Sequence, residues 1–175
     1  MGVTHALIAA GLLAAVMTGG DFIWSIFEVR NKMANGILHG AAVCLAIGMV
    51  IGWRARRISA GVAAGAAIGV MAALTFYALA PWLRYFAMLP AWMLFWILFA
   101  FLQQRLLRSE GMGTAMGRGV AAALLSGAAF YAISGIWTNP PTGAPRYGIH
   151  FASWMFAFFP GFVALFIGER VRSAR

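Results

Sequence analysis

Charged residues are scarce in this sequence, and their scarcity excludes most soluble folds. Only 10% of the 175 residues are charged, whereas 63% are hydrophobic. A soluble domain carries roughly 25% charged residues, which cover its water-facing surface. Here the apolar residues instead form long and nearly uncharged runs. Runs of about 18 or more such residues are typical of membrane-spanning helices.

The apolar runs also lack the regular alternation of polar and apolar residues that a membrane β-barrel requires. Backbone polar groups in lipid must be satisfied within the protein, so spanning segments are either helices or closed barrels. We therefore predict an all-α, polytopic membrane protein of about six transmembrane helices in a single domain. Short connections favour antiparallel packing of consecutive helices. The runs lie at about 6–27, 36–53, 58–80, 86–103, 119–137 and 148–168.

Cysteine is nearly absent, and several catalytic patterns are missing altogether. Because Cys44 is the only cysteine, an intrachain disulfide is excluded. The sequence has no paired-cysteine metal pattern, no HExxH motif and no glycine-rich phosphate loop ending in lysine. We therefore expect no bound metal and no cofactor, and we assign no catalytic residue.

Acidic residues are few as well, so the net charge is +9. The basic residues do not form one patch but occupy the gaps between apolar runs, which argues against nucleic acid as a partner and for membrane lipid. Nine cations fall on one side of the predicted bundle and four on the other, which places the nine in the cytoplasm together with both termini. The composition suggests a bacterial inner membrane. The nine are Arg54, Arg56, Arg57, Arg105, Arg108, Arg118, Arg170, Arg172 and Arg175, and the four are Arg30, Lys32, Arg84 and Arg146.

An internal repeat links the later helices. Arg84 precedes Trp92 by eight residues, and Arg146 precedes Trp154 by the same interval, within similar flanking segments. We interpret residues 58–103 and 119–168 as two copies of one helical hairpin, with residues 6–53 as a diverged third copy. Pro90 and Pro160 lie at nearly equivalent repeat positions, and we expect them to kink their helices.

Glycine, by contrast, is abundant, and it recurs at intervals of four residues. Such glycines allow helix backbones to approach closely in lipid, where no hydrophobic force drives helices together. We expect them to serve mainly for packing within the bundle, with a homo-oligomer formed through the same glycine-rich faces as the alternative. They are Gly36 with Gly40, Gly48 with Gly52, and the series Gly61, Gly65 and Gly69.

The few polar side chains within the spans gather in the half of the bundle away from the arginine-rich side. Asp21 lies about 9 Å inside the end of the first span, and a carboxylate at that depth needs a partner. We therefore predict a ligand-binding site in this outer half. Its candidate residues are Asp21, Trp24, Asn35, His39, Trp137, Arg146, His150 and Trp154.

Each of these residues also has a purely structural interpretation. Asp21 and His39 would lock two helices together if they formed an ion pair or a hydrogen bond. His39 and His150 lack a third ligand at a recognisable spacing, so hydrogen-bonded packing is favoured over metal or haem binding. The tryptophans are first of all an aromatic belt at the membrane interface.

The last helix and the segment before it resemble the Insig proteins and their bacterial homologues. The resemblance rests on six spans, short basic cytoplasmic loops, and the pattern Ser153-Trp154, Phe159-Pro160-Gly161 and Gly168-Glu169-Arg170 over residues 94–172. The Trp-Trp-x-Pro-Pro signature of the eukaryotic members is absent. The resemblance implies a membrane sensor that holds a lipid or sterol-like ligand among its helices, without catalysis.

Three classes of function are therefore compatible with the sequence. The favoured one is binding of a lipid-like or other apolar small molecule in the outer half of the bundle. The second is a small-solute transporter or transport subunit, since duplicated hairpins are common in transporters. The third is a membrane enzyme that acts on a lipid through Asp21 and His39.

Overall fold

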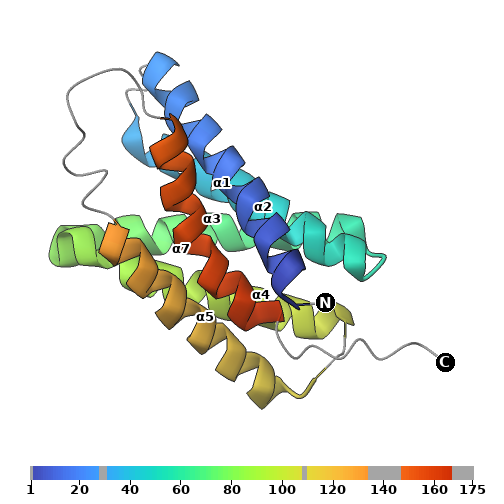
Figure 1. Cartoon of the computed structure of the whole chain (residues 1–175). Coiled ribbons are helices and arrows are strands. Elements are labelled where there is room, and N and C mark those ends of the chain that lie inside the picture. Colours follow the sequence, from blue (N-terminus) through green and yellow to red (C-terminus); the bar gives the residue numbers. More distant parts are fainter. Residues whose placement is uncertain (1, 28–30, 108–109, 134–146, 167–175) are drawn as a thin grey trace.

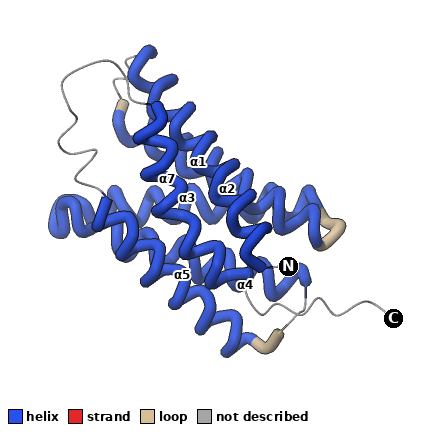
Figure 2. Tube along the Cα trace, viewed as in Figure 1, coloured by secondary structure: helices blue, strands red, loops and turns tan. Residues whose placement is uncertain are grey.

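The computed structural model describes residues 2–27, 31–107, 110–133 and 147–166, and almost all of these residues lie in long helices (Figures 1 and 2). Six of the helices are long and apolar enough to cross a membrane. The predicted all-α, six-helix membrane fold is thereby confirmed. The helices are α1 (Gly2–Phe27), α2 (Lys32–Arg54), α3 (Ile58–Leu83), α4 (Met88–Leu107), α5 (Met112–Ile133) and α7 (Tyr147–Phe166), with a 3₁₀ turn, η1 (Arg84–Ala87), before α4.

The start of α5 differs from the prediction. The helix begins at Met112 rather than near residue 119, so Arg118 lies inside it. Its guanidinium is satisfied there, because Nε lies 2.8 Å from Glu110 Oε2 and Nη1 donates to the Leu165 carbonyl oxygen at 3.2 Å. Arg118 thus donates a hydrogen bond to a carbonyl group near the end of α7. Because its charge is satisfied, Arg118 can lie within α5 and need not precede it.

Proline also acts differently from the expectation. Pro90 lies in the first turn of α4, where its missing N–H has no intrahelical acceptor to lose. Pro160 does lie inside α7, as expected, and Pro81 lies inside α3 near its end. Only the helix-interior prolines remove a hydrogen bond from their helix, so the predicted kink in the fourth helix has no basis at Pro90.

The α2–α3 hairpin packs backbone against backbone. A Cβ added at Gly65 would collide with the Cys44 carbonyl oxygen and lie 3.0 Å from Gly48 Cα. A Cβ at Gly69 would likewise collide with the Gly40 carbonyl oxygen. The predicted packing role of these glycines within the chain is confirmed. Self-association through glycine-rich faces stays a prediction, and it would need glycines outside this seam.

The helices α4, α5 and α7 form a second unit, and α1 packs on it through α7 (Figure 1). We expected consecutive helices to be neighbours, but α1 contacts α7 far more than it contacts α2. The buried face of α1 carries small side chains, among them the fully buried Ala6, Ala10 and Ala14. The helix can therefore pack closely against the larger side chains of α7. The row of close glycine contacts between α2 and α3, here called the glycine seam, packs α2 against α3 instead of α1.

Candidate ligand cavity

A cavity of about 280 Å³ lies between the α2–α3 hairpin and the helices α4 and α7, with α1 at its edge. Glycine brings α2 and α3 together along one face, while large side chains on α4 and α7 hold the hairpin away on the other. The wall is mostly apolar. It includes Met17 of α1, His39 of α2, Tyr77 of α3, Trp92 of α4, and Trp154 and Phe158 of α7.

The cavity lies in the half of the bundle away from the arginine-rich turn between α2 and α3. His39 precedes Arg54 by 15 residues (54 minus 39), which is about 22 Å along the axis of α2 at ~1.5 Å per residue. Its other walls fall in the first half of α4, at Trp92, and in the second half of α3, at Tyr77. This is the half to which the sequence assigned the candidate site.

His39 joins α2 to α1 at the edge of the cavity. Its Nε2 lies 3.0 Å from Met17 Sδ, and the ring can donate to this sulfur in the tautomer that carries the proton on Nε2. The imidazole also lies so close to Gly20 that a Cβ there would collide with it. A large, partly polar side chain is thus accommodated by a glycine on the neighbouring helix.

Tyr77 of α3 lines the cavity with its hydroxyl against α2. The ring lies against Gly36, where an added Cβ would collide with the hydroxyl oxygen, and edge-on to Phe76 at 5.2 Å between ring centroids. The phenol and the imidazole of His39 are hydrogen-bonding groups in a mostly apolar wall. Such an arrangement, apolar with few polar groups, is typical of small-molecule sites.

Stacked aromatic rings form the wall on the α4 and α7 side. The ring of Phe158 is stacked with Trp92 at 5.3 Å and with Trp154 at 5.7 Å between centroids. Trp92 and Trp154 are also the two residues that the predicted repeat aligns, so equivalent positions meet on one ring. The duplication itself stays a prediction.

A buried chain of hydrogen bonds fixes this wall. Trp92 Nε1 donates to Ser126 Oγ at 2.8 Å, and the Ser126 hydroxyl donates to the Ala157 carbonyl oxygen at 2.5 Å. Ser126 is fully buried, and its bonds join α4, α5 and α7. Ser126 was not among the predicted site residues, although a hydroxyl in an apolar run is a known form of interhelical contact in lipid.

The structure places only part of the predicted site. His39 and Trp154 line the cavity, whereas His150 lies beside Phe22, with 5.6 Å between ring centroids, and is not part of the wall. The remaining candidates fall outside what the structure describes, so the pairing of His39 with a carboxylate stays a prediction. These are Trp137 and Arg146, and the side chains of Asp21, Trp24 and Asn35.

Together the fold and the cavity define a polytopic helical integral membrane protein with a small apolar chamber between two packing units. No protein-family model, curated protein or solved structure matches the chain. The chamber and the charges at the ends of the bundle are therefore the features that bear on function.

Proposed function

We propose that this integral membrane protein binds a lipid-like or other apolar small molecule in the chamber between α2–α3 and α4–α7. The observation that carries the proposal is the cavity of about 280 Å³ with an aromatic, mostly apolar wall. Ligand pockets typically span about 300–1,000 Å³, so this chamber is at the small end of the range. Its size suits one alkyl chain or a small ring system better than a whole two-chain phospholipid.

The chemistry of the wall supports an amphipathic ligand. An apolar body would lie against Trp92 and Phe158, where burial from water and ring contact both favour binding. A single hydroxyl or carbonyl on the ligand would face His39 and Tyr77. Engineered cavities with wholly apolar linings stay dry and take up apolar guests, which is the behaviour we expect of the inner part of this chamber.

A filled chamber is the test. Ala72 lines the cavity on α3, whereas Ala67 of the same helix is exposed on the outer surface. We expect Ala72→Leu to remove the part of the tryptophan quenching by 8-bromooctanol that unbrominated octanol displaces, because the added side chain occupies the space beside Trp92. Ala67→Leu is the matched control and should retain the quenching of the unmodified protein.

Two results would contradict the proposal. One is equal quenching in both variants that unbrominated octanol does not displace. The other comes from mass spectrometry of lipid extracts. It is the finding that no small molecule is more abundant in the extract of the unmodified protein than in that of Ala72→Leu. The first result would show that the probe reaches tryptophans from the surrounding detergent, and the second that the chamber holds no ligand.

The resemblance to the Insig proteins supports the same proposal and implies sensing. Of the two alternatives, transport predicts solute uptake into proteoliposomes that Ala72→Leu blocks. Enzymatic action on a lipid predicts that Asp21→Asn and His39→Ala abolish a cellular phenotype together. The ionisable side chains that the structure describes in the wall are His39, Tyr77 and Cys44.

We further propose that the arginine-rich end of the bundle faces the cytoplasm of a bacterial inner membrane. The start of α1 and the end of α7 both lie at that end (Figure 1). The charge asymmetry between the two ends supports the orientation. Alkaline phosphatase fused to the C-terminus should then be inactive, and a fusion after Leu83 active; the reverse pattern would overturn the assignment.

A further inference from the structure

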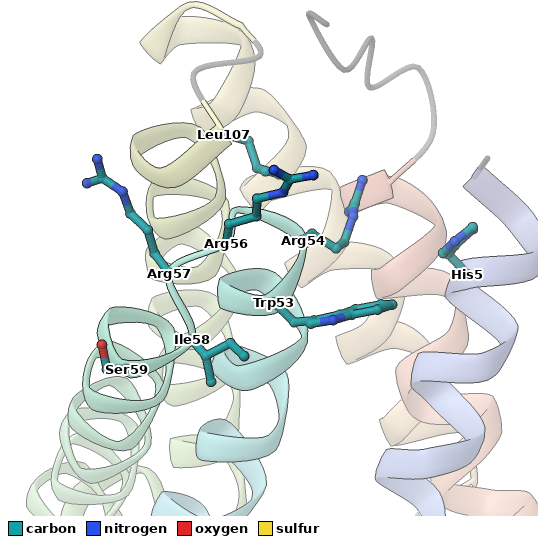
Figure 3. Close-up of a pocket in the computed structure, with 8 residues that line it drawn as sticks. All are labelled: His5, Trp53, Arg54, Arg56, Arg57, Ile58, Ser59 and Leu107. Atoms are coloured by element: carbon teal, nitrogen blue, oxygen red, sulfur yellow. The ribbon is translucent and has the colours of Figure 1, made fainter. Parts of the chain in front are cut away.

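The end of the bundle opposite the chamber has a hollow of its own, of about 810 Å³ (Figure 3). It is formed by the turn between α2 and α3, with contributions from the start of α1 and the end of α4. Both α2 and α3 reach the limit of their apolar spans at this turn. The hollow therefore lies at the level where lipid headgroups meet the protein.

A compact turn brings cationic side chains into this hollow. Arg56 has a φ of 55°, and Arg57 N–H donates to the Gly52 carbonyl oxygen at 2.7 Å, which reverses the chain within three residues. Figure 3 shows Arg54 and Arg56 on the same side of the turn, Arg57 directed away from them, and the Trp53 indole lying below. His5 of α1 lies across the hollow.

The charge of Arg54 has a structural reason, but that of its neighbours does not. Arg54 lies in the last turn of α2, where a cation offsets the helix dipole, and its guanidinium carbon is 5.2 Å from the centroid of the Phe166 ring. Arg56 and Arg57 are exposed. Among the acidic residues, Glu110 is the one whose side chain the structure describes, and it is paired with Arg118.

Three like charges within four residues repel one another, and an anion bound among them relieves that repulsion. Guanidinium groups match the oxygens of a phosphate in geometry, and they bind it through charge-assisted hydrogen bonds. Ile58 and Ser59 also line the hollow, so the positive end of the α3 dipole adds to the attraction. The exposed Trp53 indole is the side chain that favours the depth of the headgroups.

We propose that this hollow binds the phosphate of an anionic phospholipid headgroup, with Arg56 as its principal ligand beside Arg54. The apolar side chains of Ile58 and Leu107 would contact the glycerol and the upper acyl chains. This site is separate from the chamber, and it holds whether or not the chamber binds a ligand.

Affinity for two lipids, measured by native mass spectrometry of the purified protein in detergent, tests the site. We expect phosphatidylglycerol to bind more tightly than phosphatidylcholine. Arg56→Gln should weaken phosphatidylglycerol binding roughly tenfold, because a hydrogen bond between charged groups is lost. Arg56→Lys, which keeps the charge without the planar fork, should weaken it less.

Arg105→Gln is the matched control. Arg105 is an exposed arginine near the end of α4, at the same end of the bundle but outside the wall of the hollow. It should leave phosphatidylglycerol binding unchanged. An equal loss in Arg105→Gln and Arg56→Gln would mean that diffuse surface charge, and not a site, attracts the lipid.

Competition with a soluble phosphate ester distinguishes a lipid headgroup from a free phosphate. Glycerol 3-phosphate should compete only at much higher concentration than phosphatidylglycerol, because it lacks the acyl chains that Leu107 would contact. If it binds as tightly as the lipid, the hollow takes a free phosphate ester and the lipid assignment is wrong. Equal affinity for phosphatidylcholine and phosphatidylglycerol would likewise overturn it.

Discussion

The α2–α3 hairpin packs through a row of glycines, whereas the α4–α5–α7 unit packs mainly through aromatic side chains and one buried hydroxyl, with single glycines at Gly119 and Gly161. In the hairpin, contacts are made by backbone atoms that cannot move aside. In the aromatic unit they are made by rings such as Trp92, Phe158 and Phe162, which can change rotamer. The first kind of packing tolerates no added atom, and the second tolerates changes of shape at a moderate cost.

The chamber lies where these two kinds of packing meet. Glycine draws α2 and α3 close together, but nothing of the kind draws the hairpin to α4, where the bulk of Trp92 and Phe95 keeps it at a distance. A space of this sort forms where a pair of helices with small side chains packs against helices with large aromatic side chains. Substitutions in the two regions should therefore change the free energy of unfolding by different amounts, and each substitution has a matched control.

The largest effect is expected in the glycine seam. Gly65→Ala places a methyl group against the Cys44 carbonyl oxygen and forces two helix backbones apart. We expect a loss of about 3 kcal/mol in the free energy of unfolding, at the upper end for overpacked cores. Unfolding by sodium dodecyl sulfate in mixed micelles measures it.

Gly11→Ala is the control for the seam, since an added Cβ there meets nothing within 4 Å. It should be neutral or stabilising by up to ~1 kcal/mol, because alanine favours a helix over glycine. If Gly65→Ala is as harmless as Gly11→Ala, the close approach of α2 and α3 is wrong.

A smaller effect is expected in the aromatic unit. Ser126→Ala removes the acceptor of Trp92 Nε1–H and the donor to the Ala157 carbonyl oxygen. Leaving the buried indole N–H unpaired should cost about 1–3 kcal/mol. The same unfolding measurement applies, and the Trp92 indole N–H resonance should shift in the NMR spectrum.

Thr75→Val is the matched control for Ser126. It also removes a hydroxyl that donates to a carbonyl, but the acceptor is Met71 of the same helix, 2.8 Å away and exposed. We expect its effect on unfolding to stay within about 0.5 kcal/mol. Equal losses in the two variants would argue that the hydroxyl chain does not join the three helices.

The smallest effect on stability should come from Phe158→Leu. The change keeps an apolar side chain of similar size but removes the ring that stacks with Trp92 and Trp154, at a cost of about 1 kcal/mol. Phe156→Leu, on the same helix with 66% of its side chain exposed, should change little. Tryptophan fluorescence should alter only in Phe158→Leu, and a change in both would contradict the stacked arrangement.

The candidate site was predictable in its location but not in most of its residues. The scarcity of polar side chains indicated the outer half, and His39 and Trp154 do line the chamber. Tyr77, Trp92 and Phe158 were missed, because an aromatic residue in an apolar run looks the same whether it faces lipid, a neighbour or a cavity. Ser126 was missed because one hydroxyl in such a run has no distinctive spacing.

By itself, the sequence determined that the chain spans a membrane as helices, since long uncharged runs allow no other solution in lipid. It also determined that α2 and α3 each carry glycines on one face for close packing, because four-residue spacing places them on one side of a helix. Only the tertiary structure decided that α1 packs on α7 and that a chamber lies beside the seam. The faces of these helices are largely apolar, so hydrophobic periodicity does not identify the neighbour of each helix. The fit between faces of small side chains and faces of large ones identifies it instead.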